Sequence, residues 1–432
     1  MNLLEAKNIL KNNGNKLFEE LYGKNEVEKN LKRYECILNG FSKEFGKKDI
    51  KLFSSPGRTE ISGNHTDHNN GKVLGGSINL DCIAVAAKND SDVVNIISET
   101  FSQKFKVNIK DIEPGVEKIG TVELLKGILA GFKKRGAVIG GFDAYISSNV
   151  ISSAGVSSSA AFETLICQII NTLFNDNKLS KTDYAYIGKY AENIYWDKSS
   201  GLLDQMCCAY GGLISIDFKN PDLPKVDEID FDFAGAEHDL IIVQTGRGHA
   251  DLSADYSSIP AEMKMVAKYF GKNTLSEVNE EEFYKNIIKI RGFAGDRAVL
   301  RSIHFFDENK RVEKEVKALA ENDFETFLRN ITDSGNSSWK YLQNVYTNSA
   351  PNEQGITVAL SLSEKFLNER HIGATRVHGG GFAGVIMAMV PEKYSDEYIA
   401  YMDKFMGKGS CYKMKIRPYG SICLNEFFKE DK

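Results

Sequence analysis

The most constraining stretch of the sequence is SSAGVSSSAAFETLICQIINTLF, which changes from serine, glycine and alanine to an apolar helical pattern within a few residues. The start of a helix leaves several backbone N–H groups without intrahelical partners, and the macrodipole adds roughly half a positive charge there. An ordinary serine N-cap needs only one hydroxyl. Three consecutive serines and two alanines exceed that need, so residues 152–161 are predicted to cradle an anion such as a phosphate chain, with a plain cap as the alternative.

Two other phosphate-binding templates fail. GFSKEFGKK, from Gly40, has one residue too many for a Walker loop and places Lys48 where Ser or Thr would bind magnesium. HGGGFAG, residues 378–384, matches G-x-G-x-x-G, but VIMAMV follows it as a strand instead of the helix that a dinucleotide site requires. This segment is therefore expected to be a glycine turn between strands, either structural or close to a phosphate.

Polar side chains concentrate in GRTEISGNHTDHNNG, residues 57–71, which offers far more hydrogen-bonding groups than a turn needs. Two further carboxylates, Glu192 and Asp204, lie downstream. Asp204 sits in the small-residue segment SSGLLDQMCC with no local basic partner, so by itself it is either a helix N-cap or a functional carboxylate. An anion cradle, an arginine-bearing glycine loop and two carboxylates together indicate metal-assisted phosphoryl transfer.

The composition narrows the class of protein. Of the 432 residues, 42% are hydrophobic and 26% are charged, which is typical of a globular protein. A chain of this length usually divides into two domains of roughly 200 residues. The formal net charge of -5 is small and no Lys/Arg run stands out, so a small polar ligand is expected instead of a nucleic acid or a membrane surface.

The cysteine pattern and the first helix predict the compartment. The seven cysteines are odd in number and scattered, with no C-x-x-C and no Cys/His spacing fit for zinc, which indicates a reducing setting. MNLLEAKNILKNNGNKLFEE predicts an amphipathic helix and not a signal peptide, because acidic residues interrupt its apolar run. No apolar segment approaches the ~18 residues needed to span a bilayer. We expect a soluble, cytoplasmic protein that is a monomer.

The pattern of elements predicts an α+β fold. LDCIAVAAKND, VVNIISET and FKVNIK alternate or cluster β-branched residues, which favours an antiparallel or mixed sheet over repeated βαβ units. In the second half, strands are expected at DLIIVQTG and VIMAMV, and helices near 255–270, 281–303 and 311–332.

The motifs resemble those of the galactokinases, members of the GHMP kinase superfamily that also holds homoserine, mevalonate and phosphomevalonate kinases. GRTEISGNHTDHNNGKVL is similar to the galactokinase signature G-R-[VI]-N-L-I-G-E-H-T-D-Y-x-x-G-x-V-L. AGVSSSAA is similar to the superfamily's phosphate loop G-L-x-S-S-A, GLLDQM to G-[IL]-[ML]-D-Q-[FM], and GGGFAG to the third motif G-G-G-F-G-G. The resemblance runs from about residue 45 to residue 390. It implies the GHMP kinase fold: an N-terminal domain over 1–205 with the sugar signature and phosphate loop, a ferredoxin-like C-terminal domain over 206–432, and an active site in the cleft between them.

The resemblance also implies an activity, that of an ATP-dependent sugar 1-kinase that uses Mg²⁺ and converts galactose to galactose 1-phosphate. Arg58 would neutralise charge on the transferring phosphoryl group, and Asp204 would take or orient the proton of the anomeric hydroxyl. Ser158 and Glu192 would bind magnesium. The phosphates of ATP would lie on the backbone of Gly155, Val156, Ser157, Ser158 and Ser159. The sugar would be held by Asn64, His65, Asp67, the backbone of Gly201, and Tyr256.

One departure from the family pattern bears on the substrate. The family has Asn where this chain has Glu60, and Glu where it has Asn64. An amide can donate to an anionic substituent that a carboxylate would repel, so galacturonate, or another galactose-like sugar, is an alternative substrate. A catalytically silent sensor of galactose and ATP is a second alternative, although retention of the four implied catalytic and metal-binding side chains favours the enzyme. The other departures, none of which removes a catalytic group, are His68, Ile151 and Ala383.

Overall fold

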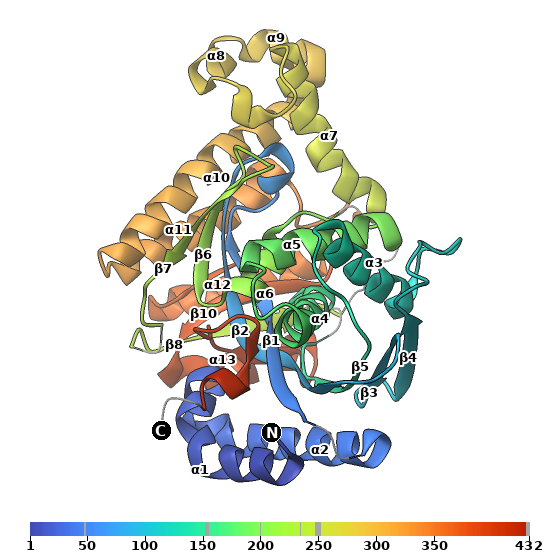
Figure 1. Ribbon diagram of the computed structural model, residues 1–432. Coiled ribbons are helices and arrows are strands. Elements are labelled where there is room, and N and C mark those ends of the chain that lie inside the picture. The colour runs from blue at the N-terminus through green and yellow to red at the C-terminus, as the bar shows by residue number, and fades with distance from the viewer. Residues whose placement is uncertain (47–48, 152–154, 199, 234, 247–251, 429–432) are drawn as a thin grey trace.

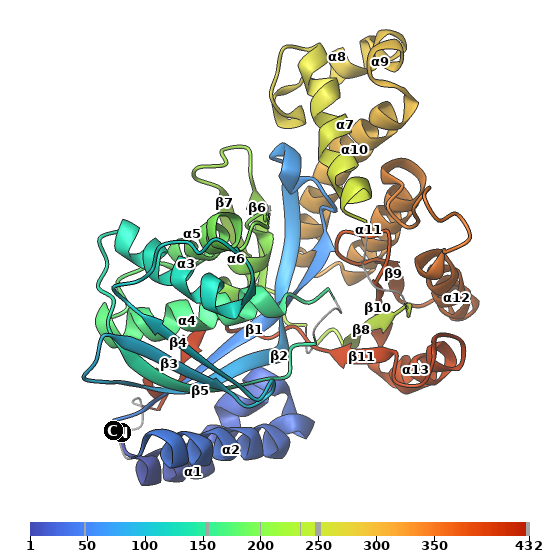
Figure 2. The same cartoon turned by 90° about the vertical axis from the view of Figure 1, so that its right-hand side faces the viewer.

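The computed structural model of the chain describes residues 1–46, 49–151, 155–198, 200–233, 235–246 and 252–428. Two sheets with helices packed against them form the body of the molecule, and a group of helices projects from one end (Figure 1, Figure 2). This mixed arrangement confirms the predicted fold class.

The first sheet has eight strands in the described part of the chain: β1 (Lys51–Ser62), β2 (Lys72–Lys88), β3 (Val93–Ser98), β4 (Gln103–Asn108), β5 (Phe142–Ser148), β6 (Leu213–Asp217), β7 (Lys225–Ile229) and β12 (Ile422–Cys423). Its main order is β12-β1-β2-β5-β3-β4, while β6 pairs with the first part of β2 and carries β7. Only β3 and β5 run parallel among these pairs, so the sheet is mixed, as the β-branched segments predicted.

Helices cover both faces of this sheet: α1 (Leu3–Tyr22), α2 (Val27–Phe45), α3 (Gly120–Lys134), α4 (Ser158–Phe174), α5 (Lys181–Tyr190) and α6 (Leu203–Tyr210). The period of two along β2 divides its apolar side chains between two cores. Ile83 and Val85 pack in the cluster that includes α1 and α2, whereas Ala84 and Ala86 pack in the cluster that includes α3 and α4. The apolar α4 is thereby enclosed, and its N-terminus is held at the level of β1.

The second sheet has four strands, β8 (His238–Gln244), β9 (Ala374–Val377), β10 (Val385–Pro391) and β11 (Cys411–Met414), in the order β11-β8-β10-β9. All three pairings are antiparallel. Helices intervene between β8 and β9, and another lies between β10 and β11: α11 (Phe324–Ser337), α12 (Gly355–Arg370) and α13 (Glu392–Met406). The succession is that of a ferredoxin-like sheet.

Four helices form the projecting end, drawn in yellow and light orange in Figure 1: α7 (Ser253–Tyr269), α8 (Glu280–Lys285), α9 (Ile287–Ala294) and α10 (Asp296–Ala320). The helix expected over 281–303 is in fact three helices, because the chain breaks at Asn286 and again at Gly295, whose φ of 87° suits glycine. The third of them then continues without interruption through residues that had been expected to connect two helices.

Pairing in the first sheet continues past residue 205. β6 and β7 begin at residues 213 and 225, and β12, at residues 422–423, pairs with β1. The boundary between 1–205 and 206–432 therefore stays a prediction, with strands on both sides of it in one sheet.

The turn between β1 and β2, residues 63–71, is anchored by α10. Glu308 accepts hydrogen bonds from the backbone N–H of Gly63 at 3.0 Å and from the hydroxyl of Ser62 at 3.1 Å. The ring of His304 bonds the carbonyl oxygen of Asn64 at 2.9 Å. The polar segment of residues 57–71 is thus fixed on one side by the first sheet and on the other by a helix of the second half.

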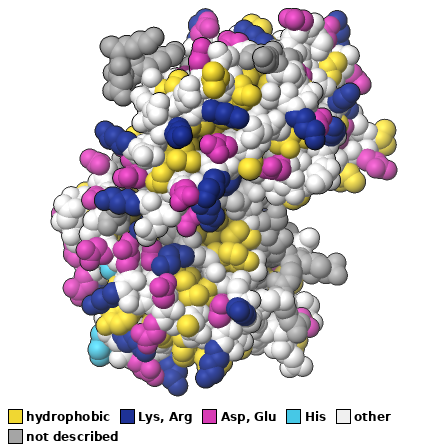
Figure 3. All heavy atoms as spheres, turned by 90° about the horizontal axis from the view of Figure 1, so that it is seen from below, with side chains coloured by type: hydrophobic (Ala, Val, Ile, Leu, Met, Phe, Trp, Pro, Cys, Tyr) yellow, Lys and Arg dark blue, Asp and Glu magenta, His cyan; other side chains and the backbone are white. Residues whose placement is uncertain are grey.

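Within the described residues, no helix combines the length and the apolar character that crossing a membrane requires. On the face drawn in Figure 3, basic and acidic side chains are interspersed and neither sign dominates a broad area.

Candidate active site

Arg58, on the first sheet, and Asp204, on a helix packed against it, form an ion pair although 146 positions separate them in the chain. The Nε of Arg58, on β1, donates to Oδ1 of Asp204, in the first turn of α6, at 2.7 Å. Burial by itself lowers the pKa of Arg58, but the carboxylate outweighs it and the pKa is raised. Burial likewise raises the pKa of Asp204, yet the guanidinium and two hydrogen bonds hold it below its usual value. Both side chains are therefore charged at neutral pH.

The described part of the predicted phosphate-binding segment lies against this pair. Arg58 donates through Nη1 to the carbonyl oxygen of Gly155, and its backbone N–H donates to the carbonyl oxygen of Val156 at 3.1 Å. A Cβ on Gly57 would lie 2.7 Å from that second oxygen, so β1 can approach the segment this closely only with glycine there. Positions 152–154 of the predicted cradle lie outside the described residues.

Ser157 joins the cradle to the carboxylate. Its φ of 56° lies in the left-handed region, uncommon for a residue with a Cβ, and its hydroxyl donates to Oδ2 of Asp204. With Oδ1 held by Arg58, both carboxylate oxygens are engaged. The next residue, Ser158, begins α4, so the free N–H groups of that helix start directly beside the pair.

Glu192 lies on a π-helical turn, Ala191–Tyr195, that follows α5, and only 1% of its surface is exposed. Its Oε1 accepts from the hydroxyl of Ser159 at 3.1 Å and from the ammonium of Lys198. The serine predicted to act with Glu192 was Ser158, but among the described contacts it is the hydroxyl of Ser159 that reaches the carboxylate. A carboxylate and a hydroxyl are hard oxygen donors that suit Mg²⁺, and the ammonium on the same oxygen indicates that the position attracts a cation.

Sequence reasoning missed the support behind Glu192. Gln205 donates through Nε2 to Oε2 of Glu163 at 3.0 Å and to Oε2 of Glu192 at 3.2 Å. Burial, and then the charge of Glu192, raise the pKa of Glu163 well above its usual range. A signal was present, because Glu163 is the one acidic residue in the apolar run AFETLICQIINTLF.

The amide of Asn64 is fully committed inside the protein. Its Nδ2 donates to Oε1 of Glu60 and to the carbonyl oxygen of Gly379, each at 2.7 Å, and its Oδ1 accepts from Asn344 at 2.7 Å. Because both partners of Nδ2 are acceptors, the orientation of the amide is fixed. No N–H of this side chain remains to donate to an anionic substituent. Galacturonate was an alternative substrate because Asn64 could make such a bond, and the structure does not support that bond.

His65 and Tyr256 hold the glycine turn that follows β9. The Nε2 of His65 bonds the carbonyl oxygen of Gly380 at 2.8 Å, and the hydroxyl of Tyr256 donates to the carbonyl oxygen of Gly381 at 2.8 Å. A Cβ on Gly380 would lie 2.3 Å from the ring of Tyr256, which explains the run of glycines. Burial and the neighbouring His68 lower the pKa of His65 to about 4, so it is neutral at neutral pH.

Asp67 and Gly201 lie in close contact in the wall of the site. A Cβ on Gly201 would lie 2.6 Å from Oδ2 of Asp67, so glycine lets the two segments meet. Both residues line a cavity of about 190 Å³, smaller than the ~300 Å³ lower limit of typical drug-sized sites and suited to a small polar ligand. Its wall brings together most of the predicted site, namely Arg58, Asn64, His65, Asp67, Glu192, Gly201 and Asp204, and adds Glu60, His68 and Lys198. Tyr256, Ser157, Ser158 and Ser159 are not part of this wall.

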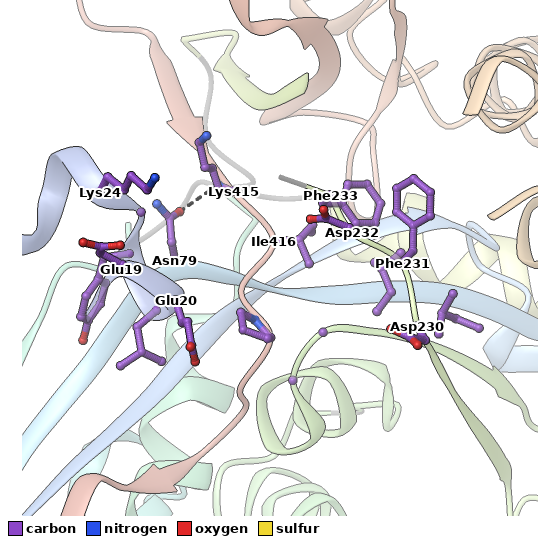
Figure 4. A pocket seen from close by; sticks show the side chains of 18 of the residues that line it. Glu19, Glu20, Lys24, Asn79, Asp230, Phe231, Asp232, Phe233, Lys415 and Ile416 are labelled. Carbon is purple, nitrogen blue, oxygen red and sulfur yellow. Dashed lines mark hydrogen bonds between the residues drawn. The ribbon is translucent and has the colours of Figure 1, made fainter. Parts of the chain in front are cut away.

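A larger cavity, of about 1100 Å³, lies away from these residues, between the end of α1, the segment after β7 and the segment after β11. Figure 4 shows that acidic side chains such as Glu19, Glu20, Asp230 and Asp232 stand around it, with Lys415 at one side. None of the predicted site residues lines it. Neither here nor elsewhere in the described residues does a group of three or more His, Cys, Asp or Glu side chains lie close enough to hold a metal ion. The smaller cavity therefore remains the candidate site.

Two family models match segments of the chain. The model of the galactokinase galactose-binding signature matches residues 39–88, and the model of the GHMP kinases N terminal domain matches residues 123–212. The first match contains β1 and the polar turn, and the second contains α4, Glu192 and Asp204.

Curated relatives match most of the chain. A protein named galactokinase from Clostridium perfringens is 29% identical over 397 residues, which are 88% of this chain and 97% of the relative. A galactokinase from Clostridium tetani is 29% identical over 378 residues, 84% of this chain and 91% of the relative.

Solved structures share the fold. The structure of Lactococcus lactis galactokinase complexed with galactose superposes with a TM-score of 0.76 at 23% identity, covering 90% of this chain and 99% of that one. Mevalonate kinase of Methanococcus jannaschii gives a TM-score of 0.56 at 15% identity, covering 84% and 98%. The predicted GHMP kinase fold is confirmed.

Proposed function

We propose that this chain, which has the GHMP kinase fold and carries the galactokinase signature, is an ATP-dependent sugar 1-kinase that converts galactose to galactose 1-phosphate. The names of its curated relatives and the two matched models support this proposal. The single observation that carries it is the buried Arg58–Asp204 pair, held between a polar cavity of sugar size and the start of α4.

The pair has a distinct task for each partner. Arg58 is charged and immobilised by Asp204 and Gly155, so its guanidinium is ready to neutralise charge that builds up on a transferring phosphoryl group. Asp204 is ionised, with a pKa below its usual value, which makes it a weak base and a good hydrogen-bond acceptor. We infer that it orients the anomeric hydroxyl and lets the proton leave late, since little proton transfer is needed in a loose transition state.

The segment from Gly155 to Ser159 is the proposed site for the terminal phosphates of ATP. Free N–H groups at the start of α4 and the helix dipole favour an anion there. Because Ser157 bonds Asp204 and Gly155 bonds Arg58, a phosphate bound on this backbone would lie next to the reacting pair.

Magnesium is proposed at Glu192, with one serine hydroxyl. When bound, it would offset the negative charge of the phosphates. The sequence assigned Ser158 to this site, and the contact between Ser159 and Glu192 makes Ser159 the better candidate. Lys198 donates to the same carboxylate, so its ammonium would lie close to a bound phosphate.

The test is ADP release by the purified chain with ATP, Mg²⁺ and a panel of galactose, glucose, galacturonate and mevalonate, with ³¹P NMR to locate the phosphate. We expect turnover with galactose and a phosphate on its anomeric oxygen. Binding of galactose and ATP without ADP release would favour the sensor, and turnover of mevalonate alone would refute a sugar kinase. The monomeric state and the cytoplasmic location stay predictions, the first testable by light scattering.

A further inference from the structure

Glu60, which lines the cavity together with Asn64 and Arg58, has one carboxylate oxygen bonded within the protein and one without a partner among the described residues. Its Oε1 accepts from Nδ2 of Asn64 at 2.7 Å and from Nη2 of Arg376 at 3.3 Å. Its Oε2 has no partner among the described residues. It is also not one of the unpaired polar atoms that are fully buried. Since Glu60 lines the cavity and only 10% of its side chain is exposed, that exposed part faces the cavity.

The surroundings of Glu60 fix which oxygen is offered. Asn64 and Arg376 both donate to the same oxygen, and the Arg376 side chain is fully buried, so the carboxyl group cannot turn over without losing both donors. Burial raises the pKa of Glu60, while Arg376, Asn64 and Arg58 oppose that rise. The side chain is thus a preorganised hydrogen-bond acceptor.

The spacing along β1 relates Glu60 to the reacting centre. Arg58 and Glu60 are two residues apart on one strand and line the same cavity, which separates their Cα atoms by roughly 7 Å. That span is comparable with the length of one pyranose ring. A hexose whose anomeric oxygen lies at Arg58 and Asp204 therefore brings a substituent from the other end of its ring to Glu60.

We propose that Glu60 is a specificity-determining residue: its free Oε2 accepts a hydrogen bond from a hydroxyl of the sugar remote from the anomeric carbon, and it repels a sugar that carries a carboxylate there. This inference rests on the proposed sugar-kinase function. The residues at 60 and 64 exchange acid and amide relative to the family signature, but the carboxylate–amide hydrogen bond between the two positions is present, with the acid on the strand and the amide in the turn.

The variant that tests this is Glu60→Gln. Asn64 and Arg376 both donate, so they hold the carbonyl oxygen of the substituted glutamine and turn its NH₂ group into the cavity. An acceptor toward the ligand becomes a donor without change of shape. Glu315→Gln is the matched control, because Glu315 is a fully buried carboxyl group on α10 that does not line the cavity.

The measurements are kcat/KM with ATP and calorimetric Kd for galactose, 6-deoxygalactose and galacturonate. For the wild type we expect a preference for galactose of at least hundredfold over galacturonate and at least tenfold over 6-deoxygalactose, because the latter leaves Oε2 unpaired. Glu60→Gln should reduce both ratios at least tenfold, whereas Glu315→Gln should leave them within twofold. The exchange variant Glu60→Asn/Asn64→Glu should keep the preference over galacturonate, since one carboxylate remains in the pair.

Each possible result supports or overturns either the role of Glu60 or the proposed kinase activity. Unchanged ratios in a folded Glu60→Gln protein that still turns over galactose would overturn this inference and leave the kinase proposal intact. If the wild type binds galactose without turnover, and the Kd ratios shift as expected in the variant, the inference holds and the kinase proposal fails. If neither binding nor turnover occurs with any of the sugars, both are overturned. Thermal unfolding of each variant separates loss of fold from loss of recognition.

Discussion

Replacing Asp204 by asparagine should damage the reaction far more than the fold. The substitution keeps the shape of the side chain and removes its charge, while Arg58 retains its bond to the carbonyl oxygen of Gly155. Breaking a fully buried ion pair costs about 3–5 kcal/mol and an exposed pair about 0–1 kcal/mol. The side chain of Arg58 is 9% exposed and that of Asp204 is 32% exposed. We therefore expect the free energy of unfolding to fall by about 1–3 kcal/mol.

The effect on the rate follows from what the carboxylate does in the ground state. It holds Arg58 through Oδ1 and Ser157 through Oδ2, and the sugar hydroxyl would be its third partner. Removing a group that orients a nucleophile and accepts its proton costs about 10²–10⁴ in rate. We expect kcat of Asp204→Asn to fall by that factor.

The assay is ADP release at saturating galactose and ATP, with urea unfolding of the same samples. Ser157→Ala is the matched control, because it removes one hydrogen bond from Asp204 and leaves the ion pair; its kcat should fall about tenfold or less, as for a net loss of ~1 kcal/mol. If folded Asp204→Asn kept kcat within tenfold of the wild type, the role assigned to this carboxylate would be refuted.

The pH profile of the wild type adds a second test of the same reasoning. The pKa of Asp204 lies below its usual value, so the carboxylate stays ionised as the pH falls toward 4 and is protonated only below that. We expect no inflection in kcat/KM from this group between about pH 5 and pH 8. An inflection near pH 6–7 that disappears in Asp204→Asn would contradict the argument that the group orients the hydroxyl as a permanently charged acceptor.

Three further predictions use other parts of the molecule. Ser159→Ala should raise the Mg²⁺ concentration for half-maximal ATP binding about tenfold or more, whereas Ser158→Ala should change it less than twofold. The reverse order would support Ser158, the serine predicted from the sequence to bind magnesium. The pKa of His65 is about 4 in the folded protein and 6.5 in the unfolded chain, so protonation favours the unfolded state. The free energy of unfolding should therefore fall by up to about 3 kcal/mol as the pH falls from 6.5 to 4. Urea unfolding of His65→Gln should show a smaller fall over the same range. Asp81 is fully buried, pairs with two arginines and does not line the cavity. Asp81→Asn should therefore lower the free energy of unfolding by about 3–5 kcal/mol and leave KM for galactose unchanged. An unaltered midpoint of urea unfolding would contradict this.

The sequence predicted those parts of the fold and site that depend on local pattern. The change from small residues to an apolar run at residue 158 marks the start of α4 in the structure. The isolated Asp204 in a segment without a basic partner does find its partner in space, at Arg58. The first prediction needed only the local pattern of one segment, whereas the expectation that Arg58 and Asp204 act together was implied by the resemblance to the family.

Other features could not be predicted because they depend on the tertiary structure. Glu308 lies in the polar run DENKR, which reads as a break between two helices, yet it is buried within α10 where it anchors the turn after β1. The choice between Ser158 and Ser159 depends on the rotation of α4 relative to the π-helical turn that carries Glu192. The sequence also did not indicate that the side-chain amide of Asn64 donates to Glu60, because that contact depends on the curvature of the turn between β1 and β2.

The pairing of β12 with β1 has a consequence for biosynthesis. Cys423 and Ile422 lie beside Phe53 and Ser54, so this edge of the strand that carries Arg58 stays unpaired there until the ribosome has made residues 422–423. Nascent chains shorter than this would expose a β edge to other molecules, which favours intermolecular association. A chaperone that shields this edge during translation would therefore raise the yield of the full-length chain.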